Sequence, residues 1–210
     1  MPSKVNKLKT TQPNVVAVKK RNNTKSADVR ANILNTVERL MLEEGYASVS
    51  TRRVAKEAGL KAPLIHYYYP TTDDLFLAVY HHAMEKELQR LDTALTTEQS
   101  LKALWATYCN ATQTALAMEF MALANHRKAI RKEIAKVIEQ TRERRAEKLS
   151  MLIDTNLIKT DNCSASGLAV LMIGVARTLV MEDSLGVSTG HADASACVEW
   201  LLEQVQKPRL

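Results

Sequence analysis

The chain has 210 residues and a mass of 23.5 kDa, enough for one core or two closely packed ones. Only 6 Gly and 5 Pro are present, and no alternating run of Val, Ile or Tyr separates turn pairs, so the composition favours helices and excludes a β-sheet fold. No apolar stretch approaches the roughly 18 residues that span a bilayer, and the N-terminus is polar rather than signal-like, so we expect no membrane segment and predict a cytoplasmic protein.

Positive charge is concentrated in the N-terminal third of the chain. Residues 1–69 hold 13 Lys and Arg against 5 Asp and Glu, within a total net charge of +6. Such an excess is typical of a module that neutralises phosphate groups, because binding to nucleic acid releases counterions. The cysteines, Cys109, Cys163 and Cys197, are far apart and lack zinc spacing, so we expect reduced, mostly buried thiols and no metal site.

Residues 1–25 form the first predicted segment, a disordered basic arm. They contain no acidic residue and include Pro2, Pro13 and several Ser, Thr and Asn, a composition that does not sustain a packed core. Such an arm either enters the minor groove beside a DNA-binding domain or remains a solvated tail that adds non-specific attraction. The contacts expected from it are the basic residues nearest the folded part: Lys19, Lys20, Arg21 and Lys25.

Residues 26–72 are predicted to form a three-helix domain that contains a helix-turn-helix. After a longer first helix, a short second helix starts with Ser48 or Ser50 as its capping oxygen and ends at Gly59, which takes the left-handed conformation at no steric cost. Pro63 suits the first turn of a third helix, where no backbone donor is needed. This motif lays its last helix in the DNA major groove.

The helix-turn-helix and its flanks resemble the DNA-binding domain of the TetR family of bacterial one-component repressors. The resemblance covers about residues 26–85 closely and the remainder only by helix count and length. His66 stands where a tyrosine is usual, and Thr72 stands where a lysine commonly contacts phosphate. The residues that carry the resemblance are Ile33, Leu34, Gly45, Tyr46, Val54, Ala55, Ala58, Gly59, Leu60, Ile65, Tyr67, Tyr68, Tyr69 and Leu75.

The first turns of the second and third helices hold the expected DNA contacts. The resemblance implies that Thr51 and Arg52 approach DNA, and an arginine can bond guanine O6 and N7 together. The start of the third helix should face base edges or thymine methyl groups, whereas Tyr68 and Tyr69 are expected in the core. The expected contacts are Ser50, Thr51, Arg52, Lys61, Ala62, Pro63, Leu64, His66 and Tyr67.

Residues 73–210 are predicted to form a larger helical domain for ligand binding and dimerisation, which brings the all-α fold to about nine helices. The resemblance implies that the helix after the helix-turn-helix transmits the state of the ligand by changing the separation of the DNA-binding domains. Helical periodicity is expected over about 72–91, 99–125, 126–154, 165–182 and 192–206.

Glu119 is an acidic residue inside an otherwise apolar run of the 99–125 helix. It either pairs with a basic residue such as Arg177 or His126 or serves as the polar anchor of a mostly apolar ligand pocket. Every residue assigned to that pocket is also compatible with ordinary core packing. The expected pocket residues are Trp105, Tyr108, Cys109, Thr112, Met118, Glu119, Met151, Met172 and Arg177.

The last two predicted helices carry more apolar surface than a chain of this size needs for its own core. We expect them to form a two-fold, four-helix dimer interface, with ordinary packing inside one chain as the alternative. A dimer also suits an inverted repeat, because two recognition helices then meet two half-sites. The expected interface residues are Leu171, Val175, Leu179, Cys197, Val198, Trp200, Leu201 and Val205.

The sequence shows no nucleophile elbow and no phosphate-binding glycine loop, so we expect neither an enzyme nor a bound cofactor. The function predicted is that of a homodimeric repressor, released from an inverted-repeat operator in double-stranded DNA by a small, mostly apolar inducer. Activation in place of repression remains open, because the DNA-binding part is the same for both. The alternative is a dimeric all-α ligand-binding or interaction protein with only non-specific DNA affinity.

Overall fold

The computed structural model describes residues 15–96, 100–153 and 164–205, and that part contains nine α-helices, one 3-10 turn and no strand. The all-α expectation is therefore confirmed. The elements are α1 (Val15–Glu44), η1 (Tyr46–Ser48), α2 (Thr51–Glu57), α3 (Ala62–Tyr68), α4 (Thr72–Ala94), α5 (Ser100–Tyr108), α6 (Ala111–His126), α7 (Lys128–Ser150), α8 (Ala165–Asp183) and α9 (His191–Val205).

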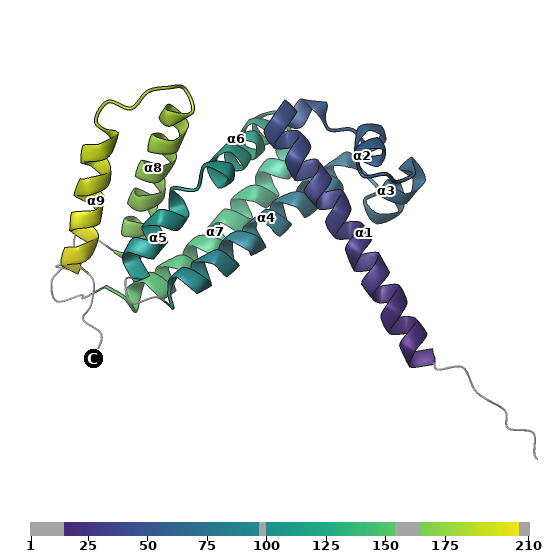
Figure 1. Cartoon of the computed structure of the whole chain (residues 1–210), viewed down its shortest axis with the longest axis horizontal. Coiled ribbons are helices and arrows are strands. Elements are labelled where there is room, and N and C mark those ends of the chain that lie inside the picture. Colours follow the sequence, from purple (N-terminus) through teal and green to yellow (C-terminus); the bar gives the residue numbers. More distant parts are fainter. Residues whose placement is uncertain (1–14, 97–99, 154–163, 206–210) are drawn as a thin grey trace, which may run out of the picture.

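The molecule is elongated, with its two ends built from different helices (Figure 1). The short helices α2 and α3 lie beside α1 at one end, and α8 and α9 stand side by side at the other. Between them run the long helices α4 and α7, which contact each other, while α6 contacts α1, α7 and α8. Helix α6 therefore reaches from the helix-turn-helix end to the body of the molecule.

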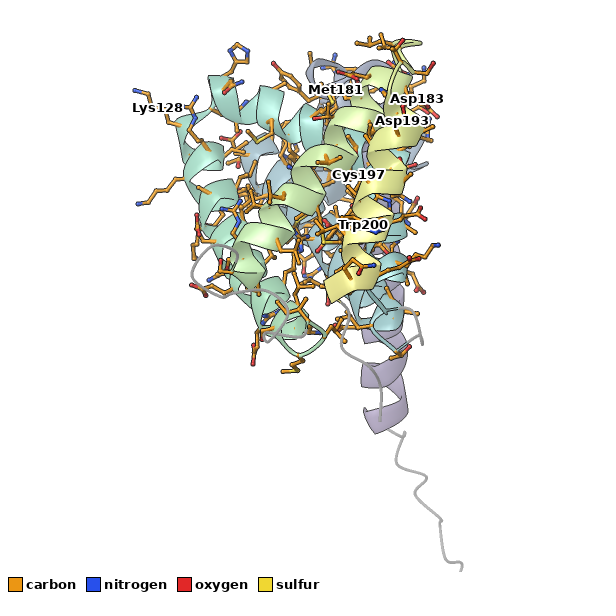
Figure 2. The ribbon with its side chains drawn as sticks, turned by 90° about the vertical axis from the view of Figure 1, so that its left-hand side faces the viewer. Lys128, Met181, Asp183, Asp193, Cys197 and Trp200 are labelled. Carbon is orange, nitrogen blue, oxygen red and sulfur yellow. The ribbon has the colours of Figure 1, made fainter. Side chains whose placement is uncertain are left out.

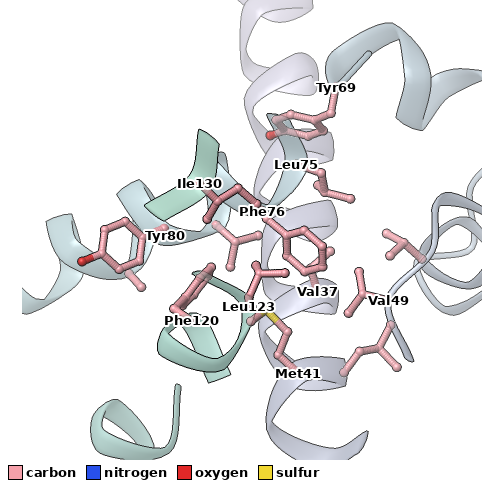
Figure 3. Close-up of a cluster of buried hydrophobic side chains, with 14 of the residues drawn as sticks. Val37, Met41, Val49, Tyr69, Leu75, Phe76, Tyr80, Phe120, Leu123 and Ile130 are labelled. Atoms are coloured by element: carbon pink, nitrogen blue, oxygen red, sulfur yellow. The ribbon is translucent and has the colours of Figure 1, made fainter. Parts of the chain in front are cut away.

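The first hydrophobic core joins the helix-turn-helix to the body (Figure 3). Met41 of α1, Phe76 of α4 and Phe120 of α6 are each at most 2% exposed, and Tyr80 packs edge-on against Phe120 with ring centroids 5.0 Å apart. Burying side chains of this size stabilises a fold by about 1.5–3 kcal/mol each. This core contains residues of α1, α2, α3, α4, α6 and α7, so the helix-turn-helix packs directly on the long helices of the body.

A second hydrophobic core lies toward the α8 and α9 end of the molecule. It contains Leu91 of α4, Leu101 and Trp105 of α5, and Met172 of α8, all at most 4% exposed. Helix α5 contacts α4, α8 and α9, so this core fixes the last two helices to the body.

Local sequence signals set the starts of α2 and α4 and the turn after α2 as predicted. Ser50 caps α2 by accepting a hydrogen bond from the Arg53 N–H, and Gly59 has the left-handed φ of 68°. Thr71 and Asp74 form a reciprocal capping box at the start of α4, with the Asp74 N–H donating to Thr71 Oγ1 at 3.0 Å. The shorter Asp side chain is long enough to close the box.

Two helix boundaries differ from the sequence-based expectation. Helix α1 begins at Val15, within the segment 1–25 expected as a basic arm; no Gly or Pro interrupts residues 15–44, and a helix nucleated by its packed half can propagate back. The single helix expected over 99–125 is two helices, because Asn110 adopts an extended conformation and its side chain caps α6 by accepting from the Gln113 N–H.

Helix α8 corrects a third expectation. This helix, Ala165–Asp183, has 19 residues and by length and composition alone could cross a membrane. The expectation that the sequence contains no such apolar stretch is therefore wrong. One helix of this kind is weak evidence for a membrane segment, because core helices pass the same test. Here one side of α8 packs on α5, α6 and α7.

Candidate nucleic-acid interface and ligand cavity

The first turns of α2 and α3 face solvent at one end of the molecule (Figure 1). Arg52 is exposed at the start of α2, and the start of α3 exposes Lys61 and Pro63. The side chain of Tyr67 is 78% exposed, which is high because tyrosine side chains in proteins are usually at least partly buried. Of the other expected contacts, Ser50 and His66 are exposed and Thr51, Ala62 and Leu64 are half-buried. The structure thus brings the expected residues of both helices to one end of the fold.

A group of ion pairs holds α2 against α1. Some arginines take part in these pairs and others do not. Arg39 of α1 contacts Glu57 of α2 at 3.0 Å, and Arg53 of α2 contacts Glu44 of α1 at 2.8 Å. The hydrogen bond from Arg39 lowers the pKa of the Glu57 carboxyl. No such pair occupies Arg52 or Lys61 within the described residues. Arg53 is therefore engaged with α1, whereas its neighbour Arg52 is exposed and has no ion pair among the described residues.

Tyr68 and Tyr69 fix the end of α3 to α1. Tyr69 is buried at 9% exposure, and the half-buried Tyr68 shares a 3.2 Å hydrogen bond with the hydroxyl of Ser26. The guanidinium of Arg30 lies 5.2 Å from the centre of the Tyr68 ring, within cation–π range. The core environment expected for Tyr69 is found, whereas Tyr68 lies at its edge.

Two exposed basic residues, Lys56 and Arg30, were not among the expected contacts. Lys56 follows Arg52 by four residues, so both lie on the same side of α2. That spacing is visible in the sequence and could have identified Lys56. Arg30 could not be identified in this way, because its place beside α3 depends on how α1 packs.

Most of the excess of Lys and Arg over Asp and Glu comes from residues 1–25, which precede the predicted three-helix domain in the sequence. Residues 26–69 contain 6 Lys and Arg against 5 Asp and Glu, so nearly all the surplus of residues 1–69 comes from 1–25. The side chains of Lys19, Lys20, Arg21 and Lys25 lie outside the described part of the structure. Their contact with DNA stays a prediction.

Glu119 joins α6 to the turn that precedes the helix-turn-helix. Its Oε2 accepts a hydrogen bond from the backbone N–H of Tyr46 at 2.7 Å, and Gly45 sits beside it with φ 82°. His126, also on α6, stacks on the Tyr46 ring with centroids 6.5 Å apart. Glu119 is therefore paired, but with a backbone donor and with neither Arg177 nor His126.

A cavity of about 270 Å³ lies between α4, α6, α7 and α8. Arg145 of α7 lies on its wall and is ion-paired with Glu87 of α4. Burial, reinforced by Glu87, raises the pKa of the Tyr80 hydroxyl to about 12, so this hydroxyl is a hydrogen-bond donor at neutral pH. The cavity is lined by Tyr80, Met84, Glu87, Ala117, Phe120, Met121, Ile134, Ile138, Thr141, Arg142, Arg145, Ile173 and Arg177.

A comparison with protein-family models identifies the family of the helix-turn-helix region. Residues 33–79, which run from the C-terminal part of α1 through the first third of α4, match the family model described as bacterial regulatory proteins, tetR family. The N-terminal domain belongs to the TetR family.

Solved structures extend the likeness in fold to most of the chain. A TetR transcription regulator from Haloarcula marismortui has a TM-score of 0.66 at 18% identity, covering 86% of this chain and 100% of its own. A putative TetR-family regulator from Rhodococcus sp. has a TM-score of 0.65 at 16% identity, covering 85% and 98%. A putative regulator from Saccharomonospora viridis in complex with choline has a TM-score of 0.65 at 17% identity, covering 87% and 100%. No curated protein matches the chain in sequence.

Most residues predicted to line a ligand pocket lie elsewhere in this TetR-type fold. Trp105, Tyr108 and Met172 are buried in the second core at 2–8% exposure, and Cys109 packs at its edge, where burial raises the pKa of its thiol. Only Arg177 lines the 270 Å³ cavity.

Three further predicted pocket residues are exposed. Thr112 and Met151 face solvent outside both cavities named here, and Met118 lines a neighbouring groove between α6 and α8. The break at Asn110 explains part of this error, because Tyr108 and Thr112 stand on different helices and share no face.

The outer side of α8 and α9 exposes apolar residues at the end of the molecule opposite the TetR domain (Figure 2). Among the expected interface residues, Leu171, Trp200 and Leu201 are 41–62% exposed and Cys197 is also exposed. The remaining three described residues, Val175, Leu179 and Val198, are half-buried against the second core, and the side chain of Val205 lies outside the described part. Exposed apolar residues that the sequence reasoning missed are Val170, Met181, Leu185 and Val187.

Proposed function

We propose that this chain is a sequence-specific transcriptional regulator, a dimeric repressor released from an inverted-repeat operator by a small ligand. The observation that carries the proposal is a TetR-type helix-turn-helix whose first turns are exposed, with Arg52 and Lys61 outside the ion pairs that fix α2. We also propose the cytoplasm as its site of action, where a bacterial regulator meets DNA.

Arg52 and the start of α3 would read the DNA. A guanidinium can bond guanine O6 and N7 together, which discriminates bases by about 1–3 kcal/mol. Ala62 and Pro63 add apolar contact with thymine methyl groups, and Lys61 with Tyr67 would position the domain on phosphates. The lysine that the family commonly places at Thr72 is replaced, and the basic residues of 1–25 would supply that charge.

The exposed apolar side of α8 and α9 supports the dimer. A face carrying Leu171, Trp200 and Leu201 at 41–62% exposure is costly to leave in water, and a second copy covers it by two-fold symmetry. The dimer would place two recognition helices at two half-sites.

The cavity beside Tyr80 and Phe120 supports release by a ligand. Both aromatic residues belong to the core that reaches the helix-turn-helix, so a molecule that displaces α4 or α6 would move the DNA-binding ends. The similar regulator from Saccharomonospora viridis is in complex with choline, which supports a small-molecule partner in kind.

The near balance of charge in residues 26–69 favours a second candidate function, a dimeric ligand-binding or interaction protein with only non-specific DNA affinity. In that case the 1–25 segment would provide nearly all DNA binding, with steep salt dependence. The two candidates differ in specificity, since a true regulator binds its site about 10³-fold or more above random DNA.

Arg52→Ala separates the two candidates. For a specific regulator, the ratio of affinities for the selected site and random DNA should fall about tenfold or more in fluorescence anisotropy titrations at fixed salt. Lys132→Ala, which removes an exposed charge on α7, outside α2 and α3, is the matched control and should leave the ratio unchanged. An unchanged ratio in Arg52→Ala, or an equal loss in the control, contradicts the specific role of Arg52.

A further inference from the structure

Arg145 carries a buried donor that the folded chain does not use. Its side chain is only 10% exposed, and its guanidinium is ion-paired with Glu87 and lies 5.8 Å from the centre of the Tyr108 ring. Its Nε is buried without a hydrogen-bond partner among the described residues. Leaving a buried donor unpaired is unfavourable, and such groups are rare in native structures. Arg145 also lines the cavity between α4, α6, α7 and α8, so an acceptor bound there would meet the accessible part of the same guanidinium group.

The cavity has an excess of positive charge. Arg142, Arg145 and Arg177 line it together with a single acid, Glu87, which Arg145 already engages. Neither Arg142 nor Arg177 has an ion pair with any residue that the structure describes. Arg142 is half-buried and Arg177 is exposed at the rim, so solvent screens the latter more strongly. An anion entering this cavity meets guanidinium groups from both α7 and α8.

The rest of the cavity wall is apolar apart from a few hydroxyl groups. Phe120 and Met121 of α6, Ile138 of α7 and Ile173 of α8 form its apolar surface. The Tyr80 hydroxyl points away from the buried apolar side chains of the first core (Figure 3). It can therefore act as a further donor at the cavity wall, since Tyr80 lines this cavity.

We propose that the cavity binds an amphipathic carboxylate, with its carboxylate held by Arg145 and Arg142 and its hydrocarbon part against Phe120, Ile138 and Ile173. This assignment rests on the proposed function, because it names the chemical class of the ligand that releases the repressor. The planar guanidinium of arginine matches a carboxylate in geometry as well as in charge, because it can donate two parallel hydrogen bonds. The ammonium of lysine matches only the charge. A quaternary ammonium such as choline is disfavoured here by the surplus of arginines.

The size of the cavity sets the scale of the ligand. Its volume of about 270 Å³ is about nine times the roughly 30 Å³ share of one water molecule. That space suits a molecule of about ten non-hydrogen atoms, such as a straight-chain carboxylate of about eight carbons. Octanoate and its neighbours in chain length are therefore suitable probes, with 1-octanol and octylammonium as neutral and cationic matches.

The test is isothermal titration calorimetry on the full chain with carboxylates from hexanoate to decanoate, and with the matched alcohols and ammonium ions. A hydrogen bond to a charged group is worth about 10-fold to 150-fold in affinity. The best carboxylate should therefore bind at least about tenfold more tightly than its alcohol, and its ammonium match should not bind.

Variants locate the binding in this cavity. Arg142→Gln and Arg177→Gln should each weaken the carboxylate about threefold to thirtyfold, with the smaller loss at the exposed Arg177, and leave the alcohol unchanged. Glu87→Gln should tighten carboxylate binding severalfold, because it frees Arg145 from its ion pair. Arg145→Met is a poor test, because it leaves Glu87 buried and unpaired and can unfold the chain. Lys132→Gln removes an exposed charge from the same helix and is the control.

The outcomes separate this inference from the proposed function. If every alcohol binds as well as its carboxylate, or if Arg142→Gln and Lys132→Gln behave alike, the carboxylate assignment is overturned and release by another ligand still stands. If a carboxylate binds with the expected dependence on Arg142 but leaves the complex with operator DNA intact, the site is supported and release by this ligand fails.

Discussion

The hydrogen bond between Glu119 and the Tyr46 backbone yields a sharp prediction, because it ties α6 directly to the turn that precedes the helix-turn-helix. Glu119→Ala removes the acceptor and leaves the Tyr46 N–H without its partner in a half-buried position. Glu119→Gln keeps an oxygen acceptor of similar length but removes the charge. Comparing the two variants therefore separates the contribution of the hydrogen bond to the free energy of unfolding from the contribution of the charge.

The magnitude follows from the nature of the bond. At 2.7 Å, with an ionised acceptor, the bond should contribute about 1.5–3 kcal/mol to the free energy of unfolding. Alanine is the better helix former by a few tenths of a kcal/mol, which offsets a small part of the loss. We expect Glu119→Ala to cost about 1–2.5 kcal/mol and Glu119→Gln about half of that, since neutral hydrogen bonds are roughly half as strong.

Urea denaturation followed by circular dichroism measures these losses. Protein concentration must be identical for all variants, because the apparent stability of a dimer depends on it. Glu139→Ala, an exposed acid on α7 with no ion pair among the described residues, is the control and should change stability by less than about 0.5 kcal/mol. A loss below about 0.5 kcal/mol in Glu119→Ala, or equal losses for Ala and Gln at position 119, would refute the reasoning.

Two other sites give predictions of stability. Thr71→Ala removes half of the capping box of α4 and should lower the free energy of unfolding by about 1 kcal/mol, whereas Thr71→Ser should retain most of it, as thermal denaturation can show. Burial raises the pKa of Tyr80 from 10.0 to about 12, so its contribution to stability is complete below pH 10 and is lost as the pH rises through 12. Between pH 9 and pH 11 the wild type should therefore lose about 1.4 kcal/mol more than Tyr80→Phe, and parallel pH profiles from urea titrations would contradict this assignment.

The DNA-binding end was predictable from the sequence because its signals are local. The Ser50 cap, the left-handed Gly59 and the Thr71 capping box each depend on a few neighbouring residues, and the structure has all three. Helical periodicity likewise predicted the order of the helices, except that the cap at Asn110 divides one expected helix into α5 and α6 and that α1 starts earlier than expected.

The cavity was not predictable in the same way, because it depends on how helices pack. Nothing local distinguishes Arg145 and Arg142 from the solvated charges of α7, and the pairing with Glu87 joins residues 58 positions apart. Trp105 and Tyr108 were assigned to a pocket for their chemistry, yet α5 turns both into the second core. Glu119 was recognised as a group that needs a partner, but the sequence cannot indicate a backbone donor 73 positions away.

The most direct test of a sequence-specific dimeric regulator is the selection of bound sequences from a random duplex pool, at about 150 mM salt with excess competitor DNA. We expect an enriched inverted repeat whose half-sites are about one helical turn apart or a multiple of it, since the two recognition helices of a dimer face the same side of the duplex. Recovery of no motif, with binding that disappears as salt rises, would contradict the regulator and leave a protein with only non-specific DNA affinity.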